Sequence, residues 1–297
     1  MVSIELKGKN IIITGANSGL GLESAKSLSK QGATVILAVR NLQKGNEALQ
    51  AIKETNQNAS LEVMKLDLSD LKSVRDFADA YINKYNSLDI LINNAGVMFP
   101  PYQKTVDGFE LQFGSNHLGH FALTGLLLPV IKNTSGSRVV TLSSIAHRGA
   151  SIYFNNLDGS KRYKAIKFYG QSKLANLLFS KELDQRLKQN GIHTLSIACH
   201  PGISATNLVK IGNQTPRYLT SLMKILFQPA EKGALPSIFA ATEDSLKGGE
   251  YIGPNGLGNI KGYPAIEQVK KGVYDEQLMK KLWETSEKLT GVTFDFS

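Results

Sequence analysis

The sequence predicts an α/β fold in which helices cover both faces of a parallel sheet. Three observations predict it: short apolar runs recur along the chain, segments with helical spacing separate them, and no linker, repeat or low-complexity segment interrupts the alternation. Continuous apolar runs are typical of strands buried on both faces, as in a doubly wound sheet. A chain of 297 residues can bury one large core, so we expect a single domain over 1–297.

The expected strands and helices follow one another in order. The strands are NIIITG (10–15), ATVILAV (33–39), LEVMKLD (61–67), LDILINNAG (88–96), SRVVTLSS (137–144) and HTLSIAC (193–199). Among the helices between them, LESAKSLSKQG ends at Gly32, and LKSVRDFADAYINKY follows the capping pair Ser69 and Asp70. The tail from about 250 to 297 is glycine-rich and then helical, with the segment DEQLMKKLWETSEKLT.

Composition excludes several classes of protein. The only cysteine, Cys199, lies in an apolar run, so no intramolecular disulfide can form. The charged N-terminus runs straight into a strand pattern, which predicts no transmembrane segment and a cytoplasmic protein. The net charge is +9 and the pI about 9.4, but the lysines and arginines are spread along the chain and no nucleic-acid-binding motif accompanies them. We therefore expect no nucleic-acid partner.

A glycine-rich turn follows the first expected strand. In TGANSGLG, Gly15, Gly19 and Gly21 stand where a strand passes into a helix, with a second strand about 20 residues further on. Glycines allow a tight turn and let backbone amides approach a pyrophosphate, and the helix N-terminus favours the negative charge. This context predicts a Rossmann-type dinucleotide site.

The end of the second strand indicates which dinucleotide binds. An NAD site would place a carboxylate there for the ribose 2′-hydroxyl, but the sequence reads LAVRN, with Arg40 in that place. A guanidinium suits a 2′-phosphate, which it can hold with two hydrogen bonds. The sequence predicts NADP(H); the alternative is that Arg40 is an ordinary surface residue after a strand.

The stretch FYGQSKLAN places Tyr169 and Lys173 four positions apart, on one face of a helix. By itself this spacing is as consistent with a surface pair as with a proton-transferring phenol. A metal site is not expected: His117 and His120 lie three positions apart, but no third ligand pattern accompanies them.

Taken together, the motifs resemble those of short-chain dehydrogenases/reductases. TGANSGLG, Asn93-Asn94-Ala95-Gly96, Ser143-Ser144, Tyr169-x-x-x-Lys173 and the PG at 201–202 occur in that order, and the resemblance runs from about residue 8 to 250. LINNAGVM, SSIAH, YGQSKLAN and HPG are similar to the retinol dehydrogenase-like group, which also includes relatives of protochlorophyllide reductase and of the WW-domain oxidoreductase. That group carries an insertion between serine and tyrosine, here HRGASIYFNNLDGSKRYKAIKF.

The resemblance implies roles for individual residues. Tyr169 would be the acid/base, Ser144 would hydrogen-bond the substrate oxygen, with Ser143 as the alternative, Lys173 would bind the nicotinamide ribose, and Asn116 would hold a water that leads protons away. The implied cofactor contacts are Gly15, Asn17, Ser18, Gly19, Leu20, Gly21, Arg40, Asp67, Leu68, Asn94, Ala95, Gly96, Tyr169, Lys173, Pro201, Gly202, Ile203 and Thr206.

Simple electrostatics connects the pair at 169 and 173 to the chemistry. Hydride transfer to a carbonyl leaves an alkoxide, so a group must donate a proton near neutral pH. A free phenol has a pKa of about 10, and an ammonium about 4 Å away would lower it by about three units. We therefore expect Tyr169 to titrate near pH 7 and to be catalytic.

Residues 203–230 depart from the strand and helix alternation. Their many apolar side chains predict a helical lid that covers a small lipophilic aldehyde, ketone or alcohol substrate; the alternative is that they pack on the domain or form a contact in a homo-oligomer. The predicted function is an NADP(H)-dependent oxidoreductase. A non-catalytic NADP(H) sensor or scaffold is the alternative, although such a protein would tolerate loss of any of the four catalytic candidates.

Overall fold

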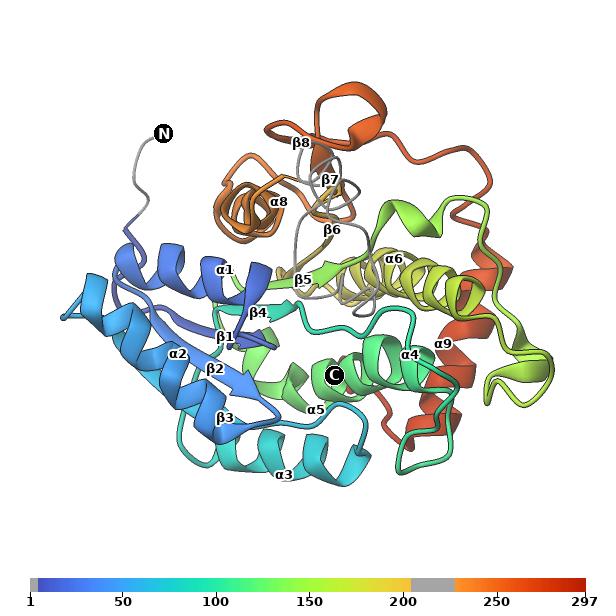
Figure 1. Cartoon of the computed structure of the whole chain (residues 1–297), viewed down its shortest axis with the longest axis horizontal. Helices are drawn as coiled ribbons and strands as arrows, with labels where there is room; N and C mark the ends of the chain where they lie inside the picture. The colour runs from blue at the N-terminus through green and yellow to red at the C-terminus, as the bar shows by residue number, and fades with distance from the viewer. Residues whose placement is uncertain (1–4, 204–227) are drawn as a thin grey trace, which may run out of the picture.

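The computed structural model of the protein describes residues 5–203 and 228–297. Its strands form one eight-stranded sheet in the order β3-β2-β1-β4-β5-β6-β7-β8 (Figure 1). All neighbouring strands are parallel except β7 and β8, which are antiparallel. The strands are β1 (Asn10–Thr14), β2 (Thr34–Val39), β3 (Ser60–Lys65), β4 (Ile90–Asn93), β5 (Arg138–Leu142), β6 (Leu195–Cys199), β7 (Tyr251–Pro254) and β8 (Pro264–Ile266).

Helices connect the parallel strands and follow the last one. They are α1 (Gly19–Lys30), α2 (Leu42–Thr55), α3 (Leu71–Ile82), α4 (Leu111–Phe113), α5 (Gly119–Lys132), α6 (Ala165–Gln189), α8 (Ala230–Thr242) and α9 (Glu276–Thr290). A π-helical turn, η1 (Gly114–Leu118), joins α4 to α5, and short 3-10 turns lie at η2 (Ile145–His147), η3 (Phe154–Asn156) and η4 (Leu257–Asn259). Asp70 caps α3 by accepting hydrogen bonds from the backbone of Lys72 and Ser73, as its position before the helix predicts.

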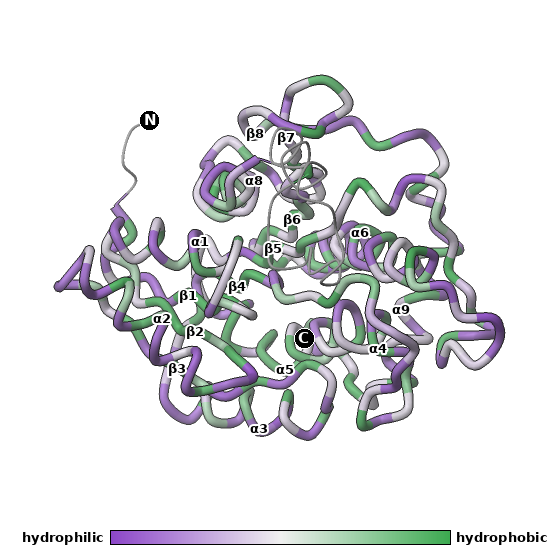
Figure 2. The backbone as a smooth tube through the Cα atoms, viewed as in Figure 1, coloured by the Kyte–Doolittle hydropathy of each residue, from purple (hydrophilic) through white to green (hydrophobic). Residues whose placement is uncertain are grey.

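The helices cover both faces of the sheet because successive strand residues point to opposite faces. In β1, Ile11 and Ile13 pack in the core under α1, α2 and α8, whereas Ile12 packs in the core under α3, α5, α6 and α9. Figure 2 shows hydrophobic residues along these central strands. Cys199, at the end of β6, is buried too, and burial raises the pKa of its thiol to about 12.

The predicted fold class is confirmed, with corrections at several element ends and in the tail. The strand expected over 137–144 ends at Leu142, and the one expected over 193–199 begins at Leu195. The strand expected over 61–67 ends at Lys65, and the one expected over 88–96 ends at Asn93, so that Asp67 and the Asn94–Gly96 turn lie beyond strand ends. The tail contains β7 and β8, which its glycine-rich composition concealed, before the expected helix α9. The expected lid, 203–230, lies almost entirely outside the described residues.

The C-terminal segment packs against the body of the sheet. Trp283 of α9 is buried and meets the rings of Phe121 and Phe179, at centroid distances of 5.1 and 5.9 Å, and that of Phe294, at 4.5 Å. Trp283 is therefore a core residue. Within the described ranges, no helix combines the length and hydrophobicity that a membrane span requires.

Candidate active site

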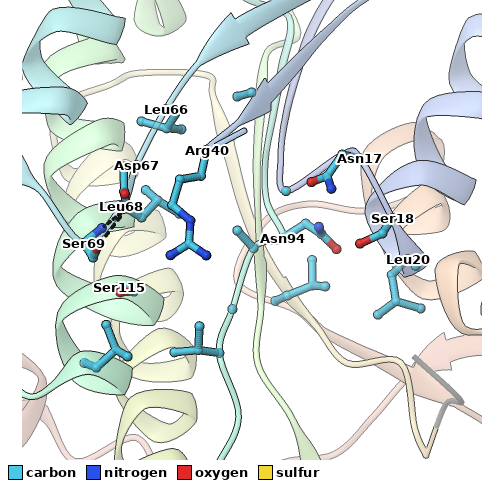
Figure 3. A pocket seen from close by; sticks show the side chains of 18 of the residues that line it. Asn17, Ser18, Leu20, Arg40, Leu66, Asp67, Leu68, Ser69, Asn94 and Ser115 are labelled. Atoms are coloured by element: carbon cyan, nitrogen blue, oxygen red, sulfur yellow. Dashed lines mark hydrogen bonds between the residues drawn. The ribbon is translucent and has the colours of Figure 1, made fainter. Parts of the chain in front are cut away.

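A cleft of about 490 Å³ opens where the strand order reverses, beside the carboxyl ends of β1 and β4. In open α/β sheets this switch point is where ligands bind. Fourteen of the predicted residues line it: Gly15, Asn17, Ser18, Gly19, Leu20, Arg40, Asp67, Leu68, Asn94, Ala95, Gly96, Tyr169, Lys173 and Pro201. Figure 3 shows ten residues of this lining by name, with Arg40 extending between the Asp67–Ser69 turn and Asn94.

The glycine turn after β1 depends on the absence of side chains. Gly15 and Gly19 have φ angles of +67° and +55°, which favour glycine. A Cβ on Gly21 would lie 2.6 Å from both Asn94 Nδ2 and the Gly15 carbonyl, so Gly21 serves the packing of α1 rather than lining the cleft. Ser18 precedes α1 without capping it through its side chain, and the first turn of α1 carries no acidic residue. The helix N-terminus therefore suits an anion.

Hydrogen bonds to Thr14 fix the turn after β4 against β1. Thr14 Oγ1 accepts the backbone N–H groups of Asn94 and Ala95, each at 2.9 Å, and Asn94 Nδ2 donates to the Thr14 carbonyl at 2.7 Å. His120 Nε2 lies 2.8 Å from Thr14 Oγ1, and its Nδ1 donates to the Asn116 carbonyl at 2.9 Å. Burial lowers the pKa of His120 to about 4, so the ring is neutral and structural.

His117 is likewise held by the protein. Its Nε2 lies 2.9 Å from Ser286 Oγ, and burial lowers its pKa to about 3. Across the two described ranges, 5–203 and 228–297, no three His, Cys, Asp or Glu side chains gather in a way that could hold a metal ion.

Two cations line the end of the cleft beside β2. Arg40 follows β2, and Lys44 lies in the first turn of α2, where its N–H donates to the capping side chain of Asn41. Neither Arg40 nor Lys44 forms an ion pair with any residue that the structure describes, and both are exposed. The sequence analysis missed Lys44, although its place four residues after Arg40, behind a helix cap, was a usable signal.

The turn after β3 closes the same end of the cleft. Asp67 Oδ1 accepts hydrogen bonds from the Ser69 backbone N–H at 3.0 Å and from its hydroxyl at 2.6 Å. These two hydrogen bonds close the turn from Asp67 to Ser69. Leu68, between them, lines the cleft.

Tyr169 and Lys173 lie one turn apart in α6, and both are buried where they line the cleft. Lys173 Nζ lies 5.8 Å from the centre of the Tyr169 ring and donates to the Leu142 carbonyl at 3.1 Å. A Cβ on Gly96 would stand 3.5 Å from Nζ and 3.3 Å from Asn116 Oδ1. Gly96 thus lets the lysine and the asparagine approach the same point.

The expectation that Tyr169 titrates near pH 7 is wrong for this arrangement. Burial raises the pKa of Tyr169, and the neighbouring Ser144 hydroxyl opposes only part of that shift. Burial also lowers the pKa of Lys173, to about 8. Desolvation of the phenolate is therefore the dominant effect on the pKa of Tyr169 in this arrangement.

The two adjacent serines differ in what their hydroxyls do. Ser143 is buried, and its Oγ donates to the Lys173 carbonyl at 2.7 Å. Ser144 is half-buried, and its Oγ accepts the Ala146 N–H at 3.2 Å, which leaves its proton available. Only the Ser144 hydroxyl acts on the pKa of Tyr169.

Asn116 lies in the π-helical turn η1, an element frequent at functional sites. Its Oδ1 accepts the Val97 N–H at 2.8 Å, and its Nδ2 donates to the Val97 carbonyl and to Ser172 Oγ, both at 3.0 Å. The side chain is thus tied to the loop after β4, beside Lys173, and does not itself line the cleft.

The loop after β6 is described only as far as Ile203. Pro201 lines the cleft, whereas the Gly202 N–H donates to His200 Nδ1 at 3.1 Å and the Ile203 N–H to the Ile260 carbonyl at 2.9 Å. Because those two amides already have protein partners, neither is free for a ligand. Thr206 lies outside the described residues.

Comparisons with known proteins agree with the fold and the site. The family model for short chain dehydrogenases matches residues 9–216, and the chain belongs to that family. Human retinol dehydrogenase 11 is 41% identical over 293 residues, which cover 99% of this chain and 89% of that protein. Human retinol dehydrogenase 13 is 39% identical, over 97% of this chain and 86% of that protein. The predicted resemblance to the retinol dehydrogenase-like group is thereby confirmed.

Solved structures show the same architecture. A crystal structure of an uncharacterised protein from Mycobacterium paratuberculosis is 40% identical, covers 98% of this chain and 96% of its own, and has a TM-score of 0.81. A short chain dehydrogenase from Shigella flexneri, complexed with NADP, shares the fold with a TM-score of 0.66 at 22% identity, over 84% of this chain and 98% of its own. Family membership makes the protein an oxidoreductase that uses a nicotinamide cofactor.

Proposed function

We propose that the protein interconverts a lipophilic aldehyde or ketone and its alcohol with NADP(H). The observation that carries the proposal is the burial of Tyr169 and Lys173 in the same cleft as the glycine turn. Lys173 forms no ion pair with a described residue, and burying an unpaired ammonium costs stability, as its lowered pKa indicates. A protein that only sensed a dinucleotide would have no need of a phenol beside that ammonium.

The candidate catalytic residues divide the proton chemistry among them. NADPH, when bound, supplies the hydride that reduces the carbonyl carbon. Tyr169 donates its proton to the carbonyl oxygen as negative charge develops there, and the Ser144 hydroxyl donates a hydrogen bond to the same oxygen. Because burial raises the pKa of Tyr169, the phenol stays protonated at neutral pH, which is the form that reduction requires. In the opposite direction the Lys173 ammonium stabilises the phenolate.

The preference for NADP(H) is supported by charge. Arg40 and Lys44 line the end of the cleft beside β2, where a carboxylate would be expected for NAD. A guanidinium can hold a 2′-phosphate with two hydrogen bonds, and an ammonium one turn of α2 away adds a second positive charge.

The lipophilic substrate is supported by the relatives, which are named retinol dehydrogenases, retinol being an apolar alcohol. The apolar lid over 203–230 remains a prediction, as does the homo-oligomer. We also propose one domain for the whole chain, which the continuous sheet from β3 to β8 supports.

The alternative is a protein that binds NADP(H) without turnover. The test is to follow NADPH oxidation by the purified protein with a panel of aldehydes, ketones and quinones, beside a calorimetric titration with NADPH. We expect turnover of apolar aldehydes. NADPH binding with no oxidation by any member of the panel would favour the sensor.

A further inference from the structure

Phe99 packs directly on the candidate catalytic tyrosine. The two rings meet edge to face, with centroids 5.2 Å apart and planes at 73°. Phe99 is nevertheless 46% exposed, so part of its ring contacts Tyr169 while the rest is open to solvent. Phe99 does not line the cofactor cleft, whereas Tyr169 does. The exposed ring therefore lies just beyond the cleft, against the ring of the tyrosine that would exchange a proton with substrate.

The backbone of Phe99 is in an unfavourable conformation. Its φ angle is +55°, and the only other non-glycine residues at positive φ in 5–203 and 228–297 are Arg162 and Asn259. A bulky side chain adopts the left-handed region at a cost, and the conformation persists only where neighbouring groups hold it. Holding an aromatic ring there directs it to a place that an ordinary backbone would not reach.

A buried polar clamp holds this conformation. Gln112 is fully buried, and its Oε1 accepts the Phe99 N–H at 2.9 Å. Its Nε2 donates to the Tyr163 hydroxyl and to the Ala165 carbonyl, both at 3.0 Å, and the Tyr163 hydroxyl donates to the Pro100 carbonyl at 2.9 Å. Both sides of Phe99 are thus fixed.

The clamp also reaches the helix that carries the tyrosine. Ala165 begins α6, and Tyr169 follows it by one turn. Ile166, also in the first turn of α6, is 68% exposed and lies three residues before Tyr169, on the same side of the helix. Phe99 and Ile166 therefore supply apolar side chains on the side of α6 that carries Tyr169, and the Tyr163 hydroxyl, from the insertion before α6, secures the loop at Phe99.

We infer that Phe99 determines substrate specificity: its ring is the wall on which the apolar part of the carbonyl substrate packs, and Gln112 is the positioning residue that holds the wall against Tyr169. The inference rests on the proposed function. It assigns the preference for apolar carbonyls to contact with Phe99, because a short polar aldehyde cannot reach or benefit from the ring.

The test compares decanal with propanal, both with NADPH. Phe99→Asn removes the ring, and asparagine tolerates the left-handed backbone, so the variant should fold. We expect the ratio of kcat/KM for decanal to that for propanal to fall about tenfold, mainly through a higher KM for decanal, the size expected for a lost apolar contact. The dissociation constant for NADPH should stay within about twofold, since Phe99 does not line the cofactor cleft.

Three further variants separate the ring from the fold. Phe99→Gly relieves the strained φ and should lower the ratio as much as Phe99→Asn without lowering Tm. Phe99→Tyr keeps the ring, so the ratio of kcat/KM for decanal to that for propanal should stay at the wild-type value. Gln112→Met leaves the ring but removes the clamp, and should lower the ratio in part.

A matched control is available in the same loop. Val106 is 78% exposed, takes no part in the clamp and does not line the cleft. Val106→Asn should leave the ratio unchanged. An unchanged ratio in folded, NADPH-binding Phe99→Asn and Phe99→Gly would overturn the assignment of Phe99. Failure of the wild-type protein to reduce any carbonyl compound would instead overturn the proposed function and this inference with it.

Discussion

The two ends of the active site are built in different ways. The cofactor end consists of strand ends and glycine turns, in which backbone groups near in sequence, as at Gly15 and Gly19, leave room for a dinucleotide. The substrate end consists of side chains brought together from distant segments, with Gln112 joining the loop at Phe99 to the insertion at Tyr163. A site of the first kind is sensitive to an added Cβ, and one of the second kind to the loss of a polar partner.

Tyr169 and Lys173 lie where the two ends meet. Their helix lines the cofactor cleft, and the ring of Tyr169 also touches Phe99 at the substrate end. Removing the Tyr169 hydroxyl at this junction should therefore affect chemistry far more than cofactor binding, and the largest effect is expected there.

Tyr169→Phe keeps the ring and its contact with Phe99 but removes the proton. We expect turnover with NADPH and decanal to fall at least about 10²-fold, while the dissociation constant for NADPH changes little. Tyr102→Phe is the control, because it removes the hydroxyl of an exposed residue that does not line the cleft. Turnover like that of the wild type in Tyr169→Phe would show that another group is the acid.

The adjacent serines should separate chemistry from stability. Ser144→Ala removes the hydroxyl beside Tyr169 and should lower kcat by about 10²-fold, as loss of an oxyanion hydrogen bond does. Ser143→Ala should lower kcat less but destabilise the fold by about 1–3 kcal/mol, because the Lys173 carbonyl loses a buried hydrogen bond. Steady-state kinetics and urea denaturation of both variants provide the comparison. The reverse pattern would make Ser143 the catalytic serine.

At the cofactor end, Arg40→Asp should weaken NADPH binding at least about tenfold, because it removes a phosphate contact and adds a repulsive charge. Binding of NADH should change much less. Lys44→Ala should show the same selectivity with a smaller effect. Calorimetric titration of each variant with both cofactors makes the measurement. Equal dissociation constants for NADPH and NADH in the wild-type protein would remove the basis for the preference.

Burial of Lys173 predicts that the free energy of unfolding depends on pH, independently of catalytic turnover. Burial lowers its pKa to about 8, from 10.5, so between these values the unfolded chain binds more protons than the folded one. Stability from this group therefore rises with pH across that window, and the buried ammonium costs at most about 3 kcal/mol below pH 8.

Lys173→Met should accordingly be inactive yet at least as stable as the wild type at pH 7, with an advantage that shrinks from pH 8 to 10. Urea denaturation of both proteins at pH 7, 8, 9 and 10 gives the difference at each value. A difference that is constant with pH would contradict the buried, unpaired lysine.

The contrast between the two ends also explains which parts of the site could be predicted from the sequence. The cofactor end was predictable because the glycine turn, Arg40 and the Asn93–Gly96 turn are short motifs. Each can be recognised from residues that are adjacent in the sequence. Lys44 was missed because its position four residues after Arg40, in the first turn of the following helix, was not read together with the expected 2′-phosphate site. The pKa of Tyr169 was predicted with the wrong sign, since burial cannot be read from a spacing of four residues.

The substrate end could not be predicted from motifs. The left-handed backbone of Phe99 is invisible in the sequence, and its clamp joins residues 13 to 63 positions apart. The last two strands were missed for a related reason: β7 and β8 are four and three residues long, and their pairing, rather than their composition, defines them.

The central claim is that this cleft transfers a hydride from NADPH to an apolar carbonyl while Tyr169 supplies the proton. It is tested most directly by incubating the protein with NADPH carrying deuterium in the transferable position of the nicotinamide C4, together with decanal, and analysing the alcohol by mass spectrometry. We predict decanol with one deuterium on its carbinol carbon, formed by the wild-type protein and not by Tyr169→Phe within the same time. Decanol without deuterium, or labelled decanol formed equally fast by Tyr169→Phe, would contradict the account.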